Sequence, residues 1–247
     1  MNIRKKHYLC GEVALMGILN VTPDSFYSAS RKQTDEEIIS RAKEILSQGG
    51  EGAIIDVGGC STRPGSDPVS EEEELRRVCH ALDLLQKMVC PEATLSVDTF
   101  RPEVAKKVVE DYGVSIVNDI SGNVSCAMPG AAYVLTSWGA TIDDIIDDFR
   151  TKISDISSRL PGTEIILDPG FGFGKTRRQE YDILLNLQRI KQEFPDNFLL
   201  VGVSRKRMIY EILGTTPDSD ATLAGTRLIH HIAMLQGADI IRSHDLL

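Results

Sequence analysis

Long hydrophobic runs and an excess of basic residues are both missing from this 247-residue chain. No apolar stretch reaches the roughly 20 residues that a membrane-spanning helix needs. The basic N-terminal stretch MNIRKKHYLCGE also lacks the apolar segment of a signal peptide. The formal net charge of -9 argues against nucleic-acid binding, since neutralising phosphates requires a basic surface. We therefore expect neither a membrane nor a nucleic acid among the partners.

Cysteines are few and are not arranged for pairing. The chain has an odd number of them, without CxxC spacing: Cys10, Cys60, Cys79, Cys90 and Cys126. This pattern disfavours a disulfide framework or a structural zinc site, so a reducing cytosol is the simplest location and we expect a cytoplasmic protein. Linkers, low-complexity tracts and shifts in composition are also missing, which predicts a single domain over residues 1–247.

Short apolar runs that close near polar residues are the main positive signal. They are VALMGILNVT with Asn20, AIIDVGG with Asp56, TLSVDT with Asp98, SIVNDIS with Asn118, AAYVLTSW with Ser137 and Trp138, EIILDPG with Asp168, FLLVGVS with Ser204, and DIIRSHD with Arg242 and His244. Most are separated by amphipathic stretches of helical length, which is typical of an α/β protein with a (β/α)8 TIM barrel. Because the C-terminal strand ends form the active-site face of such a barrel, we expect the polar residues to meet at one mouth.

The expected helices have their own start signals. Thr34 and Ser70 precede acidic turns, Pro102 occupies a permitted first-turn position, and residues 141–160, 176–194 and 221–237 have helical patterns. Between Asn118 and the next strand the chain is too short for a full crossover helix. We expect a vestigial fourth helix and no eighth helix. Two faces of the strand ring would then be open to a partner subunit or to residues 1–12.

Two loops are candidates for binding. The loop NVTPDSF, which begins at Asn20, stays polar as far as Arg31, which is longer than a capped turn requires. In GGCSTRPG (58–65), glycines let backbone N–H groups approach an anion, and serine, threonine and arginine add donors. A glycine-rich linker is the competing interpretation, and the position at the barrel mouth favours the anion site. Cys60 could be a nucleophile, but a lone cysteine without a paired histidine is more often a bystander.

Two further segments are rich in glycine or in positive charge. DPGFGFGK (168–175) has three glycines at alternate positions, which suits a loop that lies against a flat ligand and offers an aromatic face. It lacks the spacing of a nucleotide-binding P-loop. In VSRKR (203–207) three cations crowd the start of a helix, where positive charge is unfavourable. A solvated helix start is the competing interpretation, and the misfit points to a ligand.

Three of the five histidines lie in informative positions. Strand alternation sends Arg242 and His244 to the same side, where both could bind one anion. His230 and His231 are adjacent in a predicted helix, so they do not share a face and lack the i, i+4 spacing of metal ligands. We interpret this second pair as structural.

In their order along the chain, the motifs MGILNVTPDSF, DVGGCSTRPG, SVDT, VNDIS, DPGFGFGK, VGVSRK and IIRSHD closely resemble those of the dihydropteroate synthase family of the folate pathway. The resemblance runs from the first strand to the last residue. It implies a (β/α)8 barrel that joins p-aminobenzoate to 6-hydroxymethyl-7,8-dihydropterin diphosphate and releases pyrophosphate. It also implies Mg²⁺ as cofactor and a homodimer as the assembly.

The resemblance further implies roles for individual residues. The expected catalytic residues are Asp98, Lys206 and Arg63, with Asp98 stabilising positive charge as the pterin methylene carbon loses pyrophosphate. The pterin would contact Asp98, Asn118, Asp168, Lys206, Phe173 and Gly172. The diphosphate would contact Asn20, Thr62, Arg63, Arg242 and His244, and the amide oxygen of Asn20 would be the magnesium ligand. The p-aminobenzoate would contact Thr62, Pro64, Phe173 and Arg207.

Several positions depart from the family pattern near the second-substrate site. This chain has Cys60 where a glutamate is usual, Thr136-Ser137-Trp138 where a His-Met pair is usual, and Arg207 in place of serine. Arg207 either pairs with the aminobenzoate carboxylate or fills the space that serine leaves open. Two other functions remain as alternatives. A pterin-binding methyltransferase on the same barrel should lack STRPG and SRK because it handles no pyrophosphate, and a degenerate pterin-binding homologue would have lost catalysis.

Overall fold

A ring of parallel strands forms the centre of the molecule in this computed structural model, which describes residues 6–8, 11–22, 34–60, 69–88 and 93–245. In chain order the strands are β2 (Gly11–Asn20), β3 (Ile54–Gly58), β4 (Thr94–Asp98), β5 (Ile116–Asp119), β6 (Ala132–Thr136), β7 (Ile165–Asp168), β8 (Phe198–Val201) and β9 (Ile240–Ser243). Pairing between β2 and β9 closes the ring into a barrel. A short strand, β1 (Lys6–Tyr8), pairs antiparallel with the start of β2. The barrel prediction is confirmed.

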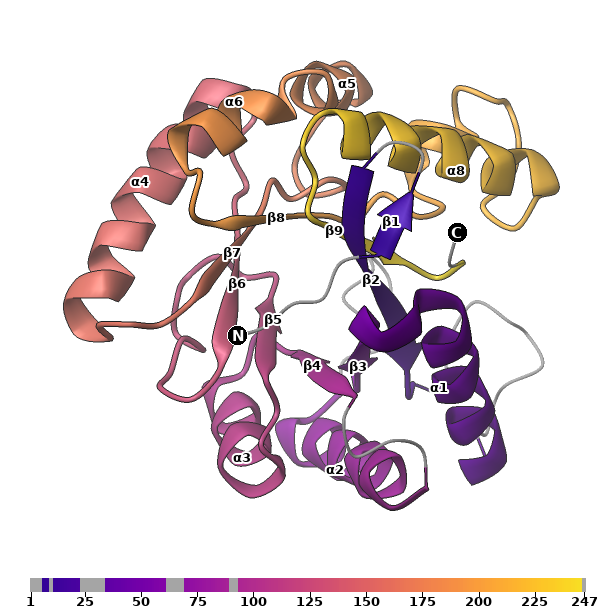
Figure 1. Cartoon of the computed structure of the whole chain (residues 1–247), viewed down its shortest axis with the longest axis vertical. Helices are drawn as coiled ribbons and strands as arrows, with labels where there is room; N and C mark the ends of the chain where they lie inside the picture. Colours follow the sequence, from indigo (N-terminus) through magenta and orange to yellow (C-terminus); the bar gives the residue numbers. More distant parts are fainter. Residues whose placement is uncertain (1–5, 9–10, 23–33, 61–68, 89–92, 246–247) are drawn as a thin grey trace.

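Helices surround the ring (Figure 1). They are α1 (Asp35–Gly49), α2 (Glu71–Met88), α3 (Pro102–Tyr112), α4 (Ile142–Arg159), α5 (Arg177–Leu184), α6 (Leu187–Glu193), α7 (Arg207–Tyr210) and α8 (Asp220–Leu235), with a 3-10 turn η1 (Gly50–Gly52). Thr34, Thr141 and Thr176 form capping boxes that begin α1, α4 and α5. The helix expected at 176–194 is two helices, because the chain turns between α5 and α6. No helix in the described parts of the chain is long and apolar enough to cross a membrane.

One position in the helical layer is reduced, as expected. Residues 120–131, between β5 and β6, form turns without a helix. Asp119 holds this region together, since its side chain accepts bonds from the Tyr133 hydroxyl and the Ser121 N–H, each at 2.8 Å. No helix follows β9 within the described residues, which end at Asp245.

The barrel interior changes from apolar to polar along its axis. Along each strand, every second side chain points into the barrel. Near the base, these inward residues form a separate apolar core made of Ala14, Met16, Ile54, Ile116, Ala132, Val134, Ile166, Leu200 and Ile240. Towards the strand ends, the same alternation presents polar residues, and strand pairing places Asn20, Gly58, Asp98 and Asn118 in one row. The predicted polar mouth therefore follows from strand register.

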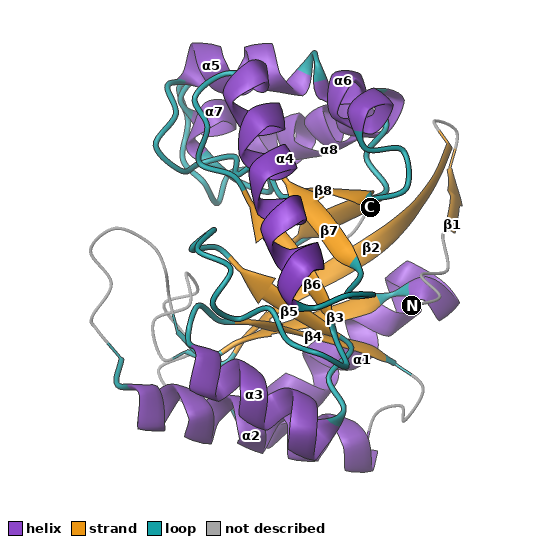
Figure 2. Ribbon diagram, turned by 90° about the vertical axis from the view of Figure 1, so that its left-hand side faces the viewer, coloured by secondary structure: helices purple, strands orange, loops and turns teal. Residues whose placement is uncertain are grey.

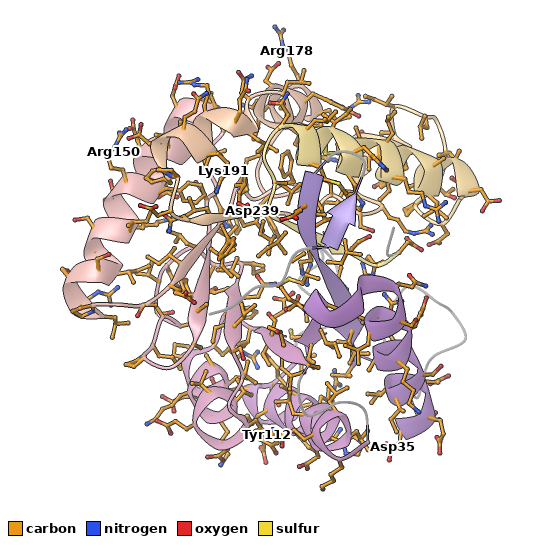
Figure 3. The ribbon with its side chains drawn as sticks, viewed as in Figure 1. Asp35, Tyr112, Arg150, Arg178, Lys191 and Asp239 are labelled. Carbon is orange, nitrogen blue, oxygen red and sulfur yellow. The ribbon has the colours of Figure 1, made fainter. Side chains whose placement is uncertain are left out.

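The base of the barrel is joined to its helical layer by an ion pair. The Nζ of Lys191, in α6, lies 2.9 Å from Oδ2 of Asp239, just before β9, and Figure 3 shows the two side chains close together. The same oxygen accepts the Leu199 N–H at 2.9 Å. Figure 2 shows the strands running between α2 and α3 on one side and α5, α6 and α8 on the other. The ion pair of Lys191 and Asp239 therefore lies at the end of the barrel opposite the mouth.

Candidate active site

A buried carboxylate, Asp56 in β3, organises the polar interior. Its Oδ1 accepts the Ser96 hydroxyl at 2.6 Å. Its Oδ2 accepts the Asn118 Nδ2 at 3.0 Å and the Arg242 Nε at 2.7 Å. The side chains of Asp56 and Ser96 are completely buried. Because both of its oxygens are bonded, Asp56 fixes the orientation of the Asn118 amide and of the Arg242 guanidinium.

Asp98, at the end of β4, shares the same guanidinium. The Arg242 Nη2 donates to the Asp98 Oδ2 at 2.7 Å. Burial raises the pKa of Asp98 to about 7, against the opposing effect of Arg242 and with a further increase from the negative charge of Asp56. Burial lowers the pKa of Arg242, but its two carboxylate partners outweigh that effect and raise it. Two carboxylates therefore share one cation, and burial brings the pKa of Asp98 close to neutral pH.

Asp168 and Lys206 form a second charged group, on β7 and on the loop after β8. The Lys206 Nζ donates to the Phe171 carbonyl and lies 5.2 Å from the centre of the Phe173 ring. Burial lowers the pKa of Lys206 to about 8, although Asp168 opposes this. Burial likewise raises the pKa of Asp168, which Lys206 opposes, and its Oδ1 accepts the Gly170 N–H at 2.8 Å. Asp168 and Lys206 therefore place a carboxylate and an ammonium on one wall of the barrel mouth.

The glycine-rich loop after β7 is braced by a buried ammonium. The Lys175 Nζ donates to the carbonyls of Ser137 at 3.2 Å, Gly170 at 2.9 Å and Phe173 at 3.4 Å. Gly170 has a φ of 70°, and a Cβ there would lie 2.1 Å from the Ser137 oxygen, so only glycine fits. Of the two phenylalanines in this loop, Phe171 is buried in the core and Phe173 is partly exposed, so Phe173 supplies the expected aromatic face.

The three adjacent cations after β8 point to different partners. Arg205 binds both carboxylate oxygens of Asp245, at 2.5 and 2.9 Å. Lys206 points to the glycine-rich loop as described above, and Arg207 is mostly exposed, 3.8 Å from the Glu211 carboxylate. Arg205 therefore has an internal partner, whereas the ligand contacts expected of Lys206 and Arg207 stay predictions. Arg205 adopts a left-handed backbone conformation, with a φ of 52°, within the turn that precedes α7.

The remaining predicted residues are placed as follows. A Cβ on Gly58 would lie 3.0 Å from the Asn20 Oδ1 and 3.8 Å from the Asp98 Cβ, so Asn20 and Asp98 lie on the two sides of Gly58. The His244 N–H donates to the Ser204 hydroxyl at 3.2 Å. Gly172 donates its N–H to Glu180 at 2.6 Å. The predicted roles of Thr62, Arg63 and Pro64 concern residues outside the described part of the chain.

Two further predictions, one for Cys60 and one for His230 and His231, concern residues away from the centre of the site. Burial raises the pKa of the Cys60 thiol, with a further increase from Glu74, which disfavours the thiolate and fits a bystander role. His230 is completely buried, and burial lowers its pKa to about 4, so its imidazole is neutral at pH 7. The neighbouring His231 bonds the Arg227 carbonyl at 2.6 Å in its own helix.

Sequence reasoning missed the central role of Asp56 and the bracing by Lys175. The signal for Asp56 was present, because an aspartate inside the apolar run AIIDVGG is costly to bury unless it has partners. The partners themselves, Ser96 and Arg242, lie on other strands and become visible only in the folded barrel.

The fold and this cluster define the class of protein. Carboxylates, an amide, an ammonium and a guanidinium line one mouth of a (β/α)8 barrel, beside the partly exposed ring of Phe173. Such a mouth is the active-site face of a barrel enzyme, and its donors and acceptors suit a planar, polar ligand.

Comparison with known proteins gives the family. The model of the pterin binding enzyme family matches residues 16–244. The dihydropteroate synthase of Clostridium beijerinckii is 34% identical, with 100% of this chain and 94% of that protein aligned. The Escherichia coli K12 dihydropteroate synthase is 35% identical, over 94% of this chain and 86% of the relative. This chain belongs to the pterin binding enzyme family, in its dihydropteroate synthase branch.

Longer relatives and solved structures agree with this placement. The folic acid synthesis protein fol1 of Schizosaccharomyces pombe is 35% identical over 93% of this chain, which spans only 34% of that protein. The crystal structure of the Clostridium difficile dihydropteroate synthase, obtained in the presence of pteroic acid, superposes with a TM-score of 0.82 at 34% identity, covering 95% of this chain and 91% of that chain. The Xanthomonas albilineans enzyme with 4-aminobenzoic acid has a TM-score of 0.74 at 33% identity, with 95% and 88% covered.

Proposed function

We propose that this chain is a dihydropteroate synthase in activity as well as in family. It joins p-aminobenzoate to 6-hydroxymethyl-7,8-dihydropterin diphosphate. The bond between the pterin methylene carbon and the diphosphate oxygen breaks, the carbon bonds to the aniline nitrogen, and that nitrogen loses a proton. Pyrophosphate leaves with the electron pair of the broken bond. The convergence of Asp98, Asn118, Asp168 and Lys206 on one mouth, beside Arg242, is the observation that carries the proposal.

The pterin ring would be bound by the inner polar residues. Since the Asn118 Nδ2 donates to Asp56, its Oδ1 is left to accept an N–H from the ligand. Asp168 would accept N–H groups from the pterin edge, and Lys206 would donate to the pterin carbonyl. Ionised Asp98 would stabilise positive charge at the methylene carbon as the diphosphate departs. An aniline nitrogen is neutral at pH 7, so the protein needs no general base to activate it.

The diphosphate would be bound near Arg242 and Asn20. A guanidinium has five N–H donors, and two of those on Arg242 are used by Asp56 and Asp98, which leaves three for phosphate oxygens. The sequence resemblance adds Thr62, Arg63 and His244 to this set. The Asn20 amide oxygen is a hard donor suited to Mg²⁺, an ion that usually binds through one or two protein oxygens together with substrate phosphates. A bound Mg²⁺ would neutralise part of the charge on the leaving pyrophosphate.

The second substrate would lie at the rim of the mouth. Phe173 offers the aromatic face, and the resemblance adds Thr62 and Pro64. The Arg207 side chain is 57% exposed, so its guanidinium can rotate towards an aminobenzoate carboxylate and would lose only a long contact, at 3.4 Å, with the Lys175 carbonyl. This exposure supports carboxylate binding over the alternative in which Arg207 fills the pocket.

A homodimer and a cytoplasmic location complete the proposal. Large apolar side chains are exposed on α8 and just after α7, namely Leu228, Leu235, Ile212 and Leu213, and a second copy of the chain would cover them. Replacing Leu228 with Glu should then shift the mass measured by light scattering from dimer to monomer. Cys60, Cys79 and Cys126, the cysteines in the described part of the chain, form no disulfide, which supports a reducing compartment.

One assay tests the proposed function. The purified protein is incubated with p-aminobenzoate, the pterin diphosphate and Mg²⁺, and dihydropteroate and pyrophosphate are measured in parallel. Equal amounts of the two products support the proposal. Pterin binding without either product would instead support a homologue that has lost catalysis.

A further inference from the structure

The single tryptophan of the chain lies at the barrel mouth, on the exposed side of the polar cluster. Trp138 follows β6, and its large aromatic side chain is 52% exposed. Its indole Nε1–H donates to the Ile120 carbonyl at 2.8 Å, which fixes the orientation of the ring. A large aromatic side chain that is both exposed and fixed in orientation is suited to contact a ligand at small entropic cost.

Trp138 and Phe173 form one aromatic surface. Their rings are stacked, with centres 5.5 Å apart and planes at 23°. The ammonium of Lys206 lies 5.2 Å from the centre of the Phe173 ring. The surface therefore runs from the Lys206 side of the mouth, across Phe173, to Trp138 at the rim.

The backbone under both rings is held by the same side chain. The buried Lys175 ammonium donates to the carbonyl of Phe173 and to that of Ser137, the residue immediately before Trp138. The loop after β6 and the loop after β7 are therefore joined at the positions that carry the two rings. This bracing keeps the aromatic surface in place before any ligand arrives.

We propose that Trp138 is a specificity-determining residue for the arylamine substrate, whose benzene ring packs against the surface formed by Phe173 and Trp138. The inference rests on the proposed function and extends it to a residue to which the sequence resemblance assigns no role. The depth of each side chain in the barrel indicates which of the two substrates it contacts. The pterin-directed groups Asn118 and Asp168 lie inside the strand ring, whereas Trp138 lies beyond the end of β6. A pterin held by the inner groups leaves the rim to the second, smaller ring.

The test compares three variants by steady-state kinetics for both substrates. Trp138→Ala removes the ring, Trp138→Phe keeps a ring without the indole donor, and Leu185→Ala is the control. Leu185 is 54% exposed, which matches Trp138, but it lies between α5 and α6 in the outer layer. An aromatic contact corresponds to a change in binding of roughly 2- to 10-fold. We expect Trp138→Ala to raise KM for p-aminobenzoate by that factor, Trp138→Phe to raise it less, and Leu185→Ala to leave it unchanged. KM for the pterin diphosphate should not change in any variant.

Fluorescence gives a second measurement on the unmodified protein. Because Trp138 is the only tryptophan, the protein's tryptophan emission comes from this position, and the same titration of Trp138→Phe measures the absorption and emission of the ligands themselves, which are subtracted. We expect p-aminobenzoate, added with 6-hydroxymethylpterin, to change the emission more than the pterin does by itself.

The outcomes separate this inference from the proposed function. An active wild type whose KM for p-aminobenzoate is the same in Trp138→Ala and Leu185→Ala overturns the role of Trp138 and leaves the activity intact. A rise in KM for the pterin diphosphate alone also overturns it, by assigning the ring to the pterin. An inactive wild type argues against the proposed function, and the fluorescence titration then decides whether an arylamine still contacts Trp138.

Discussion

Arg242 and Asp98 are 144 positions apart in the chain, yet the guanidinium Nη2 lies 2.7 Å from the carboxylate Oδ2. The same guanidinium holds Asp56 at 2.7 Å, so the last barrel strand is tied to the second and third. One cation serves two carboxylates, and an uncompensated negative charge in a buried site favours protonation of one of them. This relationship connects closure of the barrel to the chemistry of its mouth.

Activity should depend on pH through Asp98 and Lys206. Ionised Asp98 is the form that stabilises positive charge on the substrate, and its pKa is about 7, so kcat/KM should rise as the pH increases through 7. Protonated Lys206 is the form that donates to the pterin, and its pKa is about 8, so kcat/KM should fall above that pH. A pH–rate profile measured between pH 5.5 and 9.5, roughly spanning both limbs, should be bell-shaped. Asp98→Asn should lower the rate and remove the acid limb, whereas Asp83→Asn, on the exposed face of α2, should preserve it.

Stability should respond to the same carboxylate. The folded pKa of Asp98 is raised to about 7, above the unfolded value of about 3.9. A group shifted in this direction contributes stability that is fully present below the unfolded pKa and is lost as the pH rises through 7. Urea unfolding at several pH values should show this loss in the wild type and a smaller one in Asp98→Asn. Equal pH dependence in the two proteins would contradict the assignment.

Lys206→Ala should weaken pterin binding. The change removes a charge-assisted hydrogen bond, so the expected loss is about 1.5–3 kcal/mol of binding free energy, measured by calorimetry with the pterin alcohol. Lys87→Ala is the matched control, because Lys87 is an exposed lysine at the end of α2 and should leave the affinity unchanged. Unchanged pterin affinity in a folded Lys206→Ala protein would falsify the role given to Lys206.

Strand alternation explains why so much of this architecture was predictable from the sequence. Each apolar run ends in a polar residue, and the (β/α)8 repeat brings all strand ends to one face. Asp98, Asn118 and Asp168 could therefore be placed together from the sequence alone. The short connection after Asn118 also predicted the missing helix correctly. These inferences needed only local pattern and the topology of parallel strands.

Side-chain contacts between different strands and loops could not be predicted in this way. The partners of Asp56 depend on which side chains face each other across the barrel, and sequence spacing carries no such information. The internal pairing of Arg205 was missed for the same reason, since its partner, Asp245, lies 40 positions further along the chain. The stacking of Trp138 on Phe173 likewise joins two loops that no local pattern relates.

Arg242→Ala should reduce both stability and diphosphate binding. Removing the guanidinium leaves the carboxylates of Asp56 and Asp98 buried without their cation, which should cost about 3–5 kcal/mol in the free energy of unfolding. Combining Arg242→Leu with Asp56→Asn should recover part of that loss, because one buried charge is then removed. Urea titrations measure both changes.

The effect of Arg242→Ala on ligand binding is measured with two pterins, the diphosphate and the alcohol. Arg242→Ala, kept folded at low temperature, should weaken binding of the pterin diphosphate much more than binding of the pterin alcohol, because only the former offers phosphate oxygens. Equal losses for the two ligands would show that Arg242 acts only through Asp56 and Asp98.

Arg207→Ser tests how the second substrate is bound. The Arg207 Nη2 lies 3.4 Å from the Lys175 carbonyl and its Nε 3.8 Å from Glu211, so the guanidinium is weakly held and can turn towards a carboxylate. If it binds p-aminobenzoate, Arg207→Ser should raise KM for that substrate or leave it near the wild-type value, and it should not increase kcat/KM. Arg177→Ser is the matched control, because Arg177 is a second exposed arginine paired with Glu211, at 3.2 Å. A nearly inactive wild type that gains activity from Arg207→Ser, but not from Arg177→Ser, would mean that Arg207 occupies the substrate space. The departure from serine would then mark a protein that still binds pterin and has lost its second substrate.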